Sequence, residues 1–163
     1  MTACRHKAGL KWLSSIDLTA EINRKKDGEI SVLEIGARAG GGHTFHPIAS
    51  HVSWLNYPQW MARFYLGEAE APIIHKHKGA CYAFFHAQET GRLEGIYGLD
   101  AARKYPFIEI VEAWKQVGEK VSFLENSMER VGCIVALAET RDEATQAALS
   151  AREKISLKIE KNG

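Results

Sequence analysis

Two glutamates on either side of a tight turn are the residues of this chain that are best placed to do chemistry. Glu21 and Glu34 flank the Asp27-Gly28 pair, a favoured sequence for a two-residue β-hairpin turn. Counting outward from that turn places Glu21 directly opposite Glu34. Directly opposed residues on one face of a hairpin have Cβ atoms roughly 5 Å apart, and like charges there repel each other. A protonated carboxyl, an intervening basic side chain or a bridging divalent cation would relieve the repulsion.

The hairpin is expected to have one apolar face and one polar face. Strands are predicted at 18–24 and 30–35, and the same count pairs Ile22 with Leu33 on the face toward the core. The glutamates lie on the opposite face. Proteins often hold Mg²⁺ through one or two carboxylates together with substrate phosphates. Two other readings stay open: the glutamates are solvated surface residues, or a register shift of one residue separates them.

Arg38 and a run of glycines follow the second strand. Arg38 has the same strand parity as Glu34, so it points to the same side if the strand continues. An arginine there could bind a phosphate or carboxylate group through two hydrogen bonds. Gly40, Gly41 and Gly42 allow the backbone to approach a ligand closely, and their N–H groups can bind an anion. Metal, arginine and backbone donors around one point suit phosphoryl or acyl-phosphate chemistry.

The remaining sequence predicts the elements that must position these residues, as a mixed α+β chain with mostly hairpin-linked, antiparallel strands. A helix is predicted from Asn56, its N-cap, to Gly67. A longer helix should begin after Thr140, which forms a capping box with the glutamate three residues later, and continue through Ile155 to the basic residues near Lys158. The strands expected between them are 80–87, 93–97, 107–113 and 130–138, with a short helix at 99–105. The first two of these strands are expected to form a hairpin around a turn at Thr90-Gly91.

Composition and charge exclude several classes of protein. The chain has 163 residues, 45% of them apolar, and a formal net charge of +1, values typical of a soluble globular protein. The balanced charge gives no electrostatic case for binding nucleic acid, and no apolar run is long enough to span a membrane. The three cysteines form no close pair and no secretory signal is visible, which favours a reducing, cytoplasmic location. Cys81 and Cys133 are expected to be buried in apolar strands.

The segment from Glu21 to Gly41 resembles the closing part of an ATP-grasp domain. That family has a glutamate on one strand, a second glutamate in an E-I-N-x-R or E-I-x-x-R run, and a glycine pair. This chain has Glu21 and then EIGARAGG from residue 34. The resemblance implies that Glu21 and Glu34 hold Mg²⁺ (or Mn²⁺) bridging the phosphates of ATP. It also implies that Arg38 stabilises an acyl-phosphate intermediate, with Gly40 and Gly41 beside the phosphate.

The E-I-x-A-R-x-x-G form is similar to L-amino acid ligases and related carboxylate–amine ligases. One departure is Gly36, which stands where many members have an asparagine as a third metal ligand. The tail, CYAFFHAQETGRLEGIYGLD at 81–100 and ERVGCIVALAETRDEATQAALSAREKI at 129–155, resembles the small C-terminal domain of those ligases and, less closely, biotin carboxylase. The implied division is the C-terminal portion of an ATP-grasp domain at 1–70, a linker at 71–78 and a small C-terminal α+β domain at 79–163.

The implied activity is the ATP-dependent joining of a small carboxylate to an amine through an acyl phosphate, with release of ADP. Complete ATP-grasp enzymes are much longer, so we expect the N-terminal, nucleotide-binding half to be missing or to be supplied by a separate chain. The chain alone is then expected to be inactive, and apolar surface left uncovered is expected to favour a homo-oligomer. The alternatives are a non-catalytic scaffold or dimerisation module and a biotin carboxylase-like piece.

The histidines and aromatic residues after the glycines allow two interpretations each. None of the cysteines stands near the histidines in the sequence, so their spacing does not predict a zinc site; His43 or His46 could instead line an amino-acid pocket. His75 and His77 are expected to be solvated linker residues. The aromatic side chains between 54 and 64 are expected to form helix core, with an apolar substrate pocket as the alternative: Trp54, Tyr57, Trp60 and Phe64.

Overall fold

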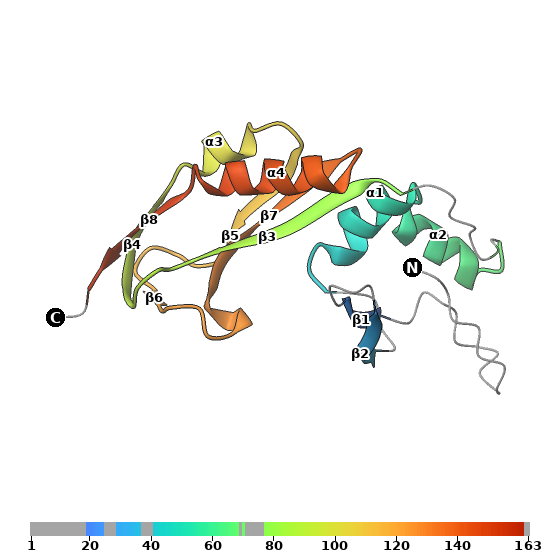
Figure 1. The fold of residues 1–163 in the computed structure, drawn as a ribbon, viewed down its shortest axis with the longest axis horizontal. Helices are drawn as coiled ribbons and strands as arrows, with labels where there is room; N and C mark the ends of the chain where they lie inside the picture. Colours follow the sequence, from blue (N-terminus) through green and yellow to red (C-terminus); the bar gives the residue numbers. More distant parts are fainter. Residues whose placement is uncertain (1–18, 25–28, 37–40, 69, 71–76, 162–163) are drawn as a thin grey trace.

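The hairpin that carries the two glutamates is present in the computed structural model, which describes residues 19–24, 29–36, 41–68, 70 and 77–161. Strand β1 (Thr19–Arg24) pairs antiparallel with β2 (Ile30–Gly36). Each strand agrees with its predicted bounds to within one residue. Figure 1 shows this small two-stranded sheet below the short helices that follow it.

The register of the hairpin is partly as predicted. Glu21 is the Cα partner of Glu34, which confirms the predicted opposition of the two residues along the backbone. The predicted pairing of Ile22 with Leu33 is wrong, because the register shifts after Glu21 and Ile22 pairs with Val32. A β-bulge of this kind leaves one residue of a strand without a partner, so Leu33 is the extra residue of β2. The Asp27-Gly28 turn lies outside the described residues.

Short helical segments follow the glycines: η1 (Thr44–Ala49), α1 (Ser50–Ser53) and α2 (Tyr57–Tyr65). The predicted start of α2 is confirmed, because the side-chain oxygen of Asn56 accepts a hydrogen bond of 3.1 Å from the backbone N–H of Gln59. Pro58 occupies the first turn, where its missing N–H costs no helical hydrogen bond. Within the described residues, no helix is both long enough and apolar enough to cross a membrane.

The C-terminal half contains two three-stranded antiparallel sheets. One has the order β3 (Gly79–His86), β7 (Arg130–Ala138), β5 (Ile108–Ala113), and the other has the order β6 (Lys120–Val121), β4 (Gly91–Tyr97), β8 (Ser156–Glu160). The predicted hairpin between the strands on either side of Thr90-Gly91 is therefore wrong: those strands, β3 and β4, pair with other strands in different sheets. The antiparallel character is confirmed, but most partners are distant in the sequence rather than hairpin neighbours.

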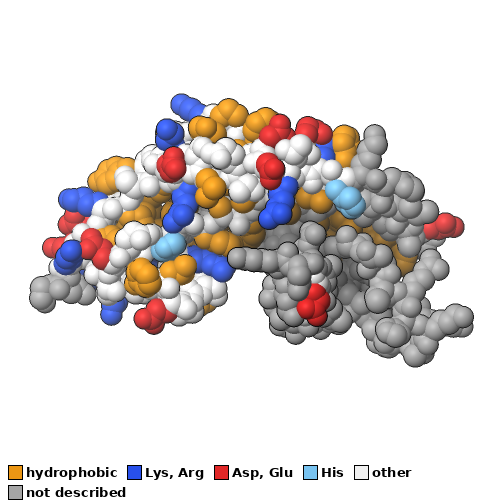
Figure 2. Space-filling model, viewed as in Figure 1, with side chains coloured by type: hydrophobic (Ala, Val, Ile, Leu, Met, Phe, Trp, Pro, Cys, Tyr) orange, Lys and Arg blue, Asp and Glu red, His pale blue; other side chains and the backbone are white. Residues whose placement is uncertain are grey.

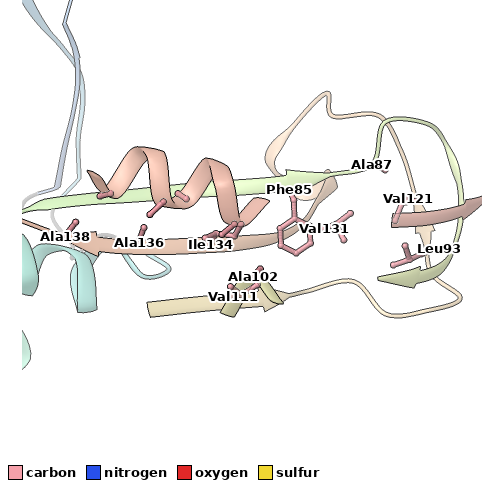
Figure 3. Packing of buried hydrophobic residues seen from close by; sticks show 14 residues of the cluster. Phe85, Ala87, Leu93, Ala102, Val111, Val121, Val131, Ile134, Ala136 and Ala138 are labelled. Atoms are coloured by element: carbon pink, nitrogen blue, oxygen red, sulfur yellow. The ribbon is translucent and has the colours of Figure 1, made fainter. Parts of the chain in front are cut away.

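Helix α4 (Arg141–Arg152) covers one face of the β3-β7-β5 sheet, with the shorter α3 (Leu99–Arg103) beside it (Figure 1). The helix buries only small side chains against the sheet, so its backbone can approach the strands closely: Ala144, Ala147, Ala148 and Ala151. Figure 3 shows β7 contributing Val131, Ile134, Ala136 and Ala138 to the same cluster. Burial of these apolar groups is the main term that stabilises this half of the chain.

The end of α4 differs from the prediction. The helix stops at Arg152 instead of continuing through Ile155, and Ser156–Glu160 forms β8, which pairs with β4. Exposure alternates along β8, with Leu157 and Ile159 packed against the core and their neighbours facing solvent. That alternation is the period of a half-buried strand, so tertiary pairing with β4 overrides the helical spacing that ends at Ile155.

The capping box of α4 gives a stability prediction. Thr140 Oγ1 accepts a hydrogen bond from the backbone N–H of Glu143, and the Glu143 carboxylate accepts one from the backbone N–H of Thr140 at 2.9 Å. Replacing Thr140 with alanine should lower the free energy of unfolding by about 1 kcal/mol, the usual cost of losing an N-cap side chain. Urea denaturation followed by circular dichroism measures this change. A Thr145→Ala variant, in the second turn of the same helix, is the control and should change stability less; equal losses would contradict a capping role.

Candidate functional site

The backbone of the hairpin brings together the two residues predicted to bind a metal. Glu21 and Glu34 are direct cross-strand partners, a geometry that puts two Cβ atoms roughly 5 Å apart. One or two carboxylates, together with phosphates, are common ligands of Mg²⁺ in proteins. Gly36, which occupies the position of the third ligand in the resembling family, pairs with Thr19 and has no side chain to donate. Arg38 and Gly40 lie outside the described residues, so their predicted roles stay predictions.

The end of the glycine-rich segment contacts the C-terminal sheet. Gly42 has a φ of +60°, and a Cβ placed there would lie 2.8 Å from the hydroxyl oxygen of Tyr82 on β3. The left-handed backbone favours a glycine at this position, and a side chain there would also have to displace the end of the Tyr82 ring. Among the described residues, none has an atom within 4 Å of a Cβ placed at Gly41, and its predicted place beside a phosphate stays a prediction.

His43 connects this segment to the sheet by a polar contact. Its Nε2 lies 3.0 Å from Oε2 of Glu112 on β5, and because a carboxylate only accepts hydrogen bonds, His43 donates. The imidazole also meets the ring of Tyr82 edge-on, with 5.9 Å between ring centroids. Trp114 Nε1 donates a second hydrogen bond of 3.2 Å to the same Glu112 oxygen. The hydrogen bonds from His43 and Trp114 hold the pKa of the Glu112 carboxyl below its usual value.

Cys133 and Tyr82 lie on this same face of the β3-β7-β5 sheet. Alternate residues of β3 and β7 pack into the core on the α4 side, so Tyr82 and Cys133, which have the other parity, face η1. Cys133 is fully buried, as predicted, and burial raises the pKa of its thiol to about 11, with the Glu112 carboxylate adding to the rise. Burial likewise raises the pKa of the Tyr82 hydroxyl. In the unliganded chain the thiol is therefore neutral near pH 7.

Among the described residues, the other histidines do not join this group. His46 Nδ1 lies 3.2 Å from the hydroxyl oxygen of Ser50, and His51 Nε2 donates to the carbonyl oxygen of Ala138 at 2.9 Å. His77 is exposed, which confirms its predicted solvation, and His75 lies outside the described residues. No cysteine stands near these histidines in the sequence, but the fold brings Cys133 close to His43, which is 90 positions away.

The aromatic residues after the glycines divide between core and surface. Trp60 is buried, and it stacks within a chain of ring contacts that includes Tyr57 and Phe64, so the core interpretation is confirmed for this residue. Trp54 is 63% exposed, which is contrary to the core interpretation. It is the last residue of the α1 turn, with a φ of +60°, and its ring lies 3.9 Å from Nζ of Lys78. A cation–π contact replaces apolar burial at this position.

Over the described residues, the face drawn in Figure 2 shows no concentration of one charge sign. Lysine, arginine and acidic side chains are interspersed over the described part of that face. Elsewhere among the described residues, ion pairs join charges of opposite sign, such as Lys158 with Glu94 at 2.6 Å and Lys161 with Glu89 at 2.8 Å. Such mixing of signs weakens the local field that a polyanion would meet.

Comparisons with known proteins agree with this architecture. Residues 83–160 match the family model for L-amino acid ligase C-terminal domain 2. A search of curated protein sequences found no match. Among solved structures, the chain is similar to L-amino acid ligase from Bacillus licheniformis, with 22% sequence identity and a TM-score of 0.72 over 87% of this chain.

Other ligases share the fold at greater distance. Phosphoribosylglycinamide synthetase from Anaerococcus prevotii gives 17% identity and a TM-score of 0.67 over 88% of this chain, and biotin carboxylase from Campylobacter jejuni gives 15% and 0.54 over 86%. The chain spans 36%, 37% and 31% of these three proteins, about a third of each.

The predicted two-part organisation at 1–70 and 79–163 is tested by none of these matches, although the family model begins within the second part. The β1-β2 hairpin, the helices after it and the antiparallel sheets together have the architecture of the C-terminal region of ATP-grasp enzymes. The chain thus resembles the C-terminal part of an L-amino acid ligase in its fold, and its residues 83–160 match the model of the L-amino acid ligase C-terminal domain 2 family.

Proposed function

We propose that this chain is the C-terminal part of an ATP-dependent carboxylate–amine ligase that works through an acyl phosphate and releases ADP. The observation that carries the proposal is the direct pairing of Glu21 with Glu34 in a chain that has the fold of an L-amino acid ligase. A pair of like charges across a hairpin is destabilising by itself. A cation shared by both side chains gives a physical reason for it.

The residues of this chain would act on the phosphates and on the intermediate. Glu21 and Glu34 would hold Mg²⁺ or Mn²⁺, and the cation would neutralise charge on the phosphates of ATP. Arg38 would bind the transferring phosphoryl group through its guanidinium, and the N–H groups of Gly40 and Gly41 would contribute further donors. The side chain missing at Gly36 implies that a second cation, if one binds, takes that ligand from elsewhere.

The reaction balances in two displacements. An oxygen of the carboxylate substrate attacks the γ-phosphorus of ATP, the bond to the β-phosphate oxygen breaks, and ADP leaves. The amine then attacks the acyl carbon, loses a proton and displaces inorganic phosphate, which leaves an amide. Charge accumulates on phosphate oxygens in the first step and on the acyl oxygen in the second, so cations and N–H donors accelerate both steps.

The proposed partners of this chain are inferred from the fraction of a related ligase that it spans. It covers 36% of the B. licheniformis ligase, so we propose that a segment or separate chain supplies the nucleotide-binding half, and that the described part alone does not turn over. The substrates would be a small carboxylate and a small amine. Exposed apolar residues such as Trp54 and Leu66 support contact with that half or with a second copy of this chain.

Trapping of the intermediate tests the activity. In a protein that combines this chain with a nucleotide-binding half, ATP, a carboxylate and hydroxylamine should give a hydroxamate and ADP in equal amounts. Glu34→Gln should lower the rate by at least about 100-fold, because an electrostatic contact to developing charge is lost. Glu29→Gln is the matched control, because it makes the same chemical change at an exposed position directly before β2. This variant should retain activity. Formation of AMP, or a Glu34 variant as active as the control, would contradict the proposal.

The alternative is a non-catalytic scaffold or dimerisation module of the same fold. It predicts that neither glutamate affects cation binding, since the pair would be ordinary surface. A biotin carboxylase-like activity is a weaker alternative, because that structural likeness has a TM-score of 0.54 against 0.72 for the amino acid ligase. Hydroxamate formation with amino acids, and not with bicarbonate, would separate these two activities.

A further inference from the structure

Three side chains that commonly bind metals meet on the sheet face next to the glycine-rich segment. One ligand atom each from His43, Glu112 and Cys133 lies within 4.8 Å of the other two. They come from three separate parts of the chain: the residue before η1, the edge strand β5 and the central strand β7. Glu112 and Cys133 are direct cross-strand partners, so the sheet fixes two of the three positions.

The chemistry of the set points to a particular class of cation. An imidazole nitrogen, a thiolate and a carboxylate are ligands of Zn²⁺ and of similar divalent transition ions, whereas Mg²⁺ prefers oxygen alone. A neutral imidazole with two anionic ligands also balances the charge of a divalent ion. A neutral complex lowers the cost of placing charge near a fully buried residue such as Cys133.

The distances are close to those of a coordinated ion. The nitrogen of His43 and the oxygen of Glu112 are already 3.0 Å apart. Bonds of about 2.0–2.3 Å in a tetrahedral site put ligand atoms about 3.5 Å from one another, and the three atoms here already lie within 4.8 Å of one another. The imidazole is 22% exposed and the Glu112 side chain 46% exposed, which gives the ion a path from solvent.

The surroundings provide support for the ligands. Trp114 Nε1 donates to Oε2 of Glu112 at 3.2 Å and orients the carboxylate, a kind of outer contact that metal ligands usually have. Within the described part of the chain, the hydrogen bonds to this carboxylate go to Oε2, which leaves Oε1 for an ion. Tyr82 packs against the imidazole edge and restricts its orientation.

We propose that His43, Glu112 and Cys133 form a binding site for Zn²⁺ or a similar divalent transition ion, with a fourth position open to water or a small ligand. Binding replaces the hydrogen bond between His43 and Glu112 with two metal–ligand bonds and adds a metal–sulfur bond, and the thiol proton is released to solvent. The ion ties the segment that follows Gly42 to the C-terminal sheet. The site is separate from the carboxylate pair and does not depend on the proposed ligase activity.

Cobalt titration of the reduced 163-residue chain tests the site, because Co²⁺ replaces Zn²⁺ in such sites and a Co²⁺–thiolate bond gives an intense near-ultraviolet absorption band. We expect this band on addition of Co²⁺, with bleaching by Zn²⁺. Cys133→Ser should abolish the band, and Cys81→Ser is the matched control because Cys81 is the other described free thiol, on the core side of the same sheet. Absence of the band, or its persistence in Cys133→Ser, overturns the proposal.

Two variants with exposed or half-exposed side chains keep the test decisive if Cys133→Ser does not fold. Loss of an outer contact of a metal ligand already lowers metal affinity by about 10–100-fold. Glu112→Gln and His43→Ala change the ligands themselves, so each should weaken Co²⁺ binding by at least about 100-fold. His77→Ala, at an exposed position, should bind as the unchanged chain does. Circular dichroism verifies that each variant is folded. Unchanged affinity in folded Glu112→Gln and His43→Ala overturns the three-ligand site.

Discussion

Replacing Gly98 with alanine is expected to lower the free energy of unfolding by about 2–5 kcal/mol, one of the two largest effects predicted for this chain. Gly98 has a φ of +82° and precedes α3, a backbone conformation that costs an L-residue about 1–2 kcal/mol. A Cβ there would also overlap the backbone carbonyl oxygen of Lys154. A backbone atom cannot rotate away as a side chain can, so the turn before α3 and the chain between α4 and β8 would have to separate.

Gly118→Ala is the matched control for Gly98→Ala. Gly118 also has a positive φ, +95°, but a Cβ there would meet nothing within 4 Å, so only the backbone cost of about 1–2 kcal/mol applies. Guanidinium denaturation of both variants, followed by circular dichroism, separates the two contributions. Equal losses would show that the close approach of Gly98 to Lys154 does not contribute.

The second large effect concerns the paired glutamates. Replacing Glu34 with alanine should lower the affinity for a divalent cation by at least about 100-fold, since affinity at oxygen sites depends strongly on the number of charged ligands. The same change should leave the metal-free hairpin unchanged or slightly more stable, because two opposed like charges no longer repel. The effect of the substitution on stability should thus differ between the two states: it is neutral or slightly favourable without metal, and unfavourable with metal. Only a cation that both glutamates share predicts this difference. Any general unfolding of the hairpin would instead destabilise both states.

Local sequence signals predicted the beginnings of elements well. Thr140 with Glu143, and Asn56 in α2, accept hydrogen bonds from free N–H groups within a few residues of themselves, and Pro58 has no N–H that needs a partner. The start of each helix therefore does not depend on the rest of the fold. The apolar run of β7 at 130–138 was likewise predicted to the residue, because β7 is buried on both faces and such strands are apolar along their length.

Pairings between distant strands could not be predicted in the same way. β3 and β4 are consecutive and separated by a short turn, yet β4 pairs with β8 and β6, and Leu93 finds its partner at Ile159. The alternation of polar and apolar residues along Ser156–Glu160 indicates a strand. The helical spacing of the apolar residues that ends at Ile155 overlaps this signal and favours a helix. Short segments often satisfy both periods, and only the tertiary partner decides between them.

The two candidate sites differ in how far the sequence can predict them. The opposition of Glu21 and Glu34 was predicted by a count from a two-residue turn. The pairs nearer the turn, such as Arg24 with Ile30, are offset by one residue from that count, and the bulge after Glu21 restores the predicted pairing. The meeting of His43, Glu112 and Cys133 depends on the order of strands in the β3-β7-β5 sheet and on the position of the glycine-rich segment against it. His43 and Glu112 are 69 positions apart, and no spacing rule relates them.

Manganese binding tests the central claim most directly. Bound Mn²⁺ loses the sharp electron paramagnetic resonance spectrum of the free ion, so titration of the chain, with and without ADP, measures affinity at an oxygen site without requiring turnover. We predict that the unchanged chain and Glu29→Ala bind Mn²⁺ alike, and that Glu21→Ala and Glu34→Ala each bind it at least about 100-fold more weakly. Equal Mn²⁺ binding by all four proteins, or none by any of them, would contradict the assignment of the paired glutamates as a cation site.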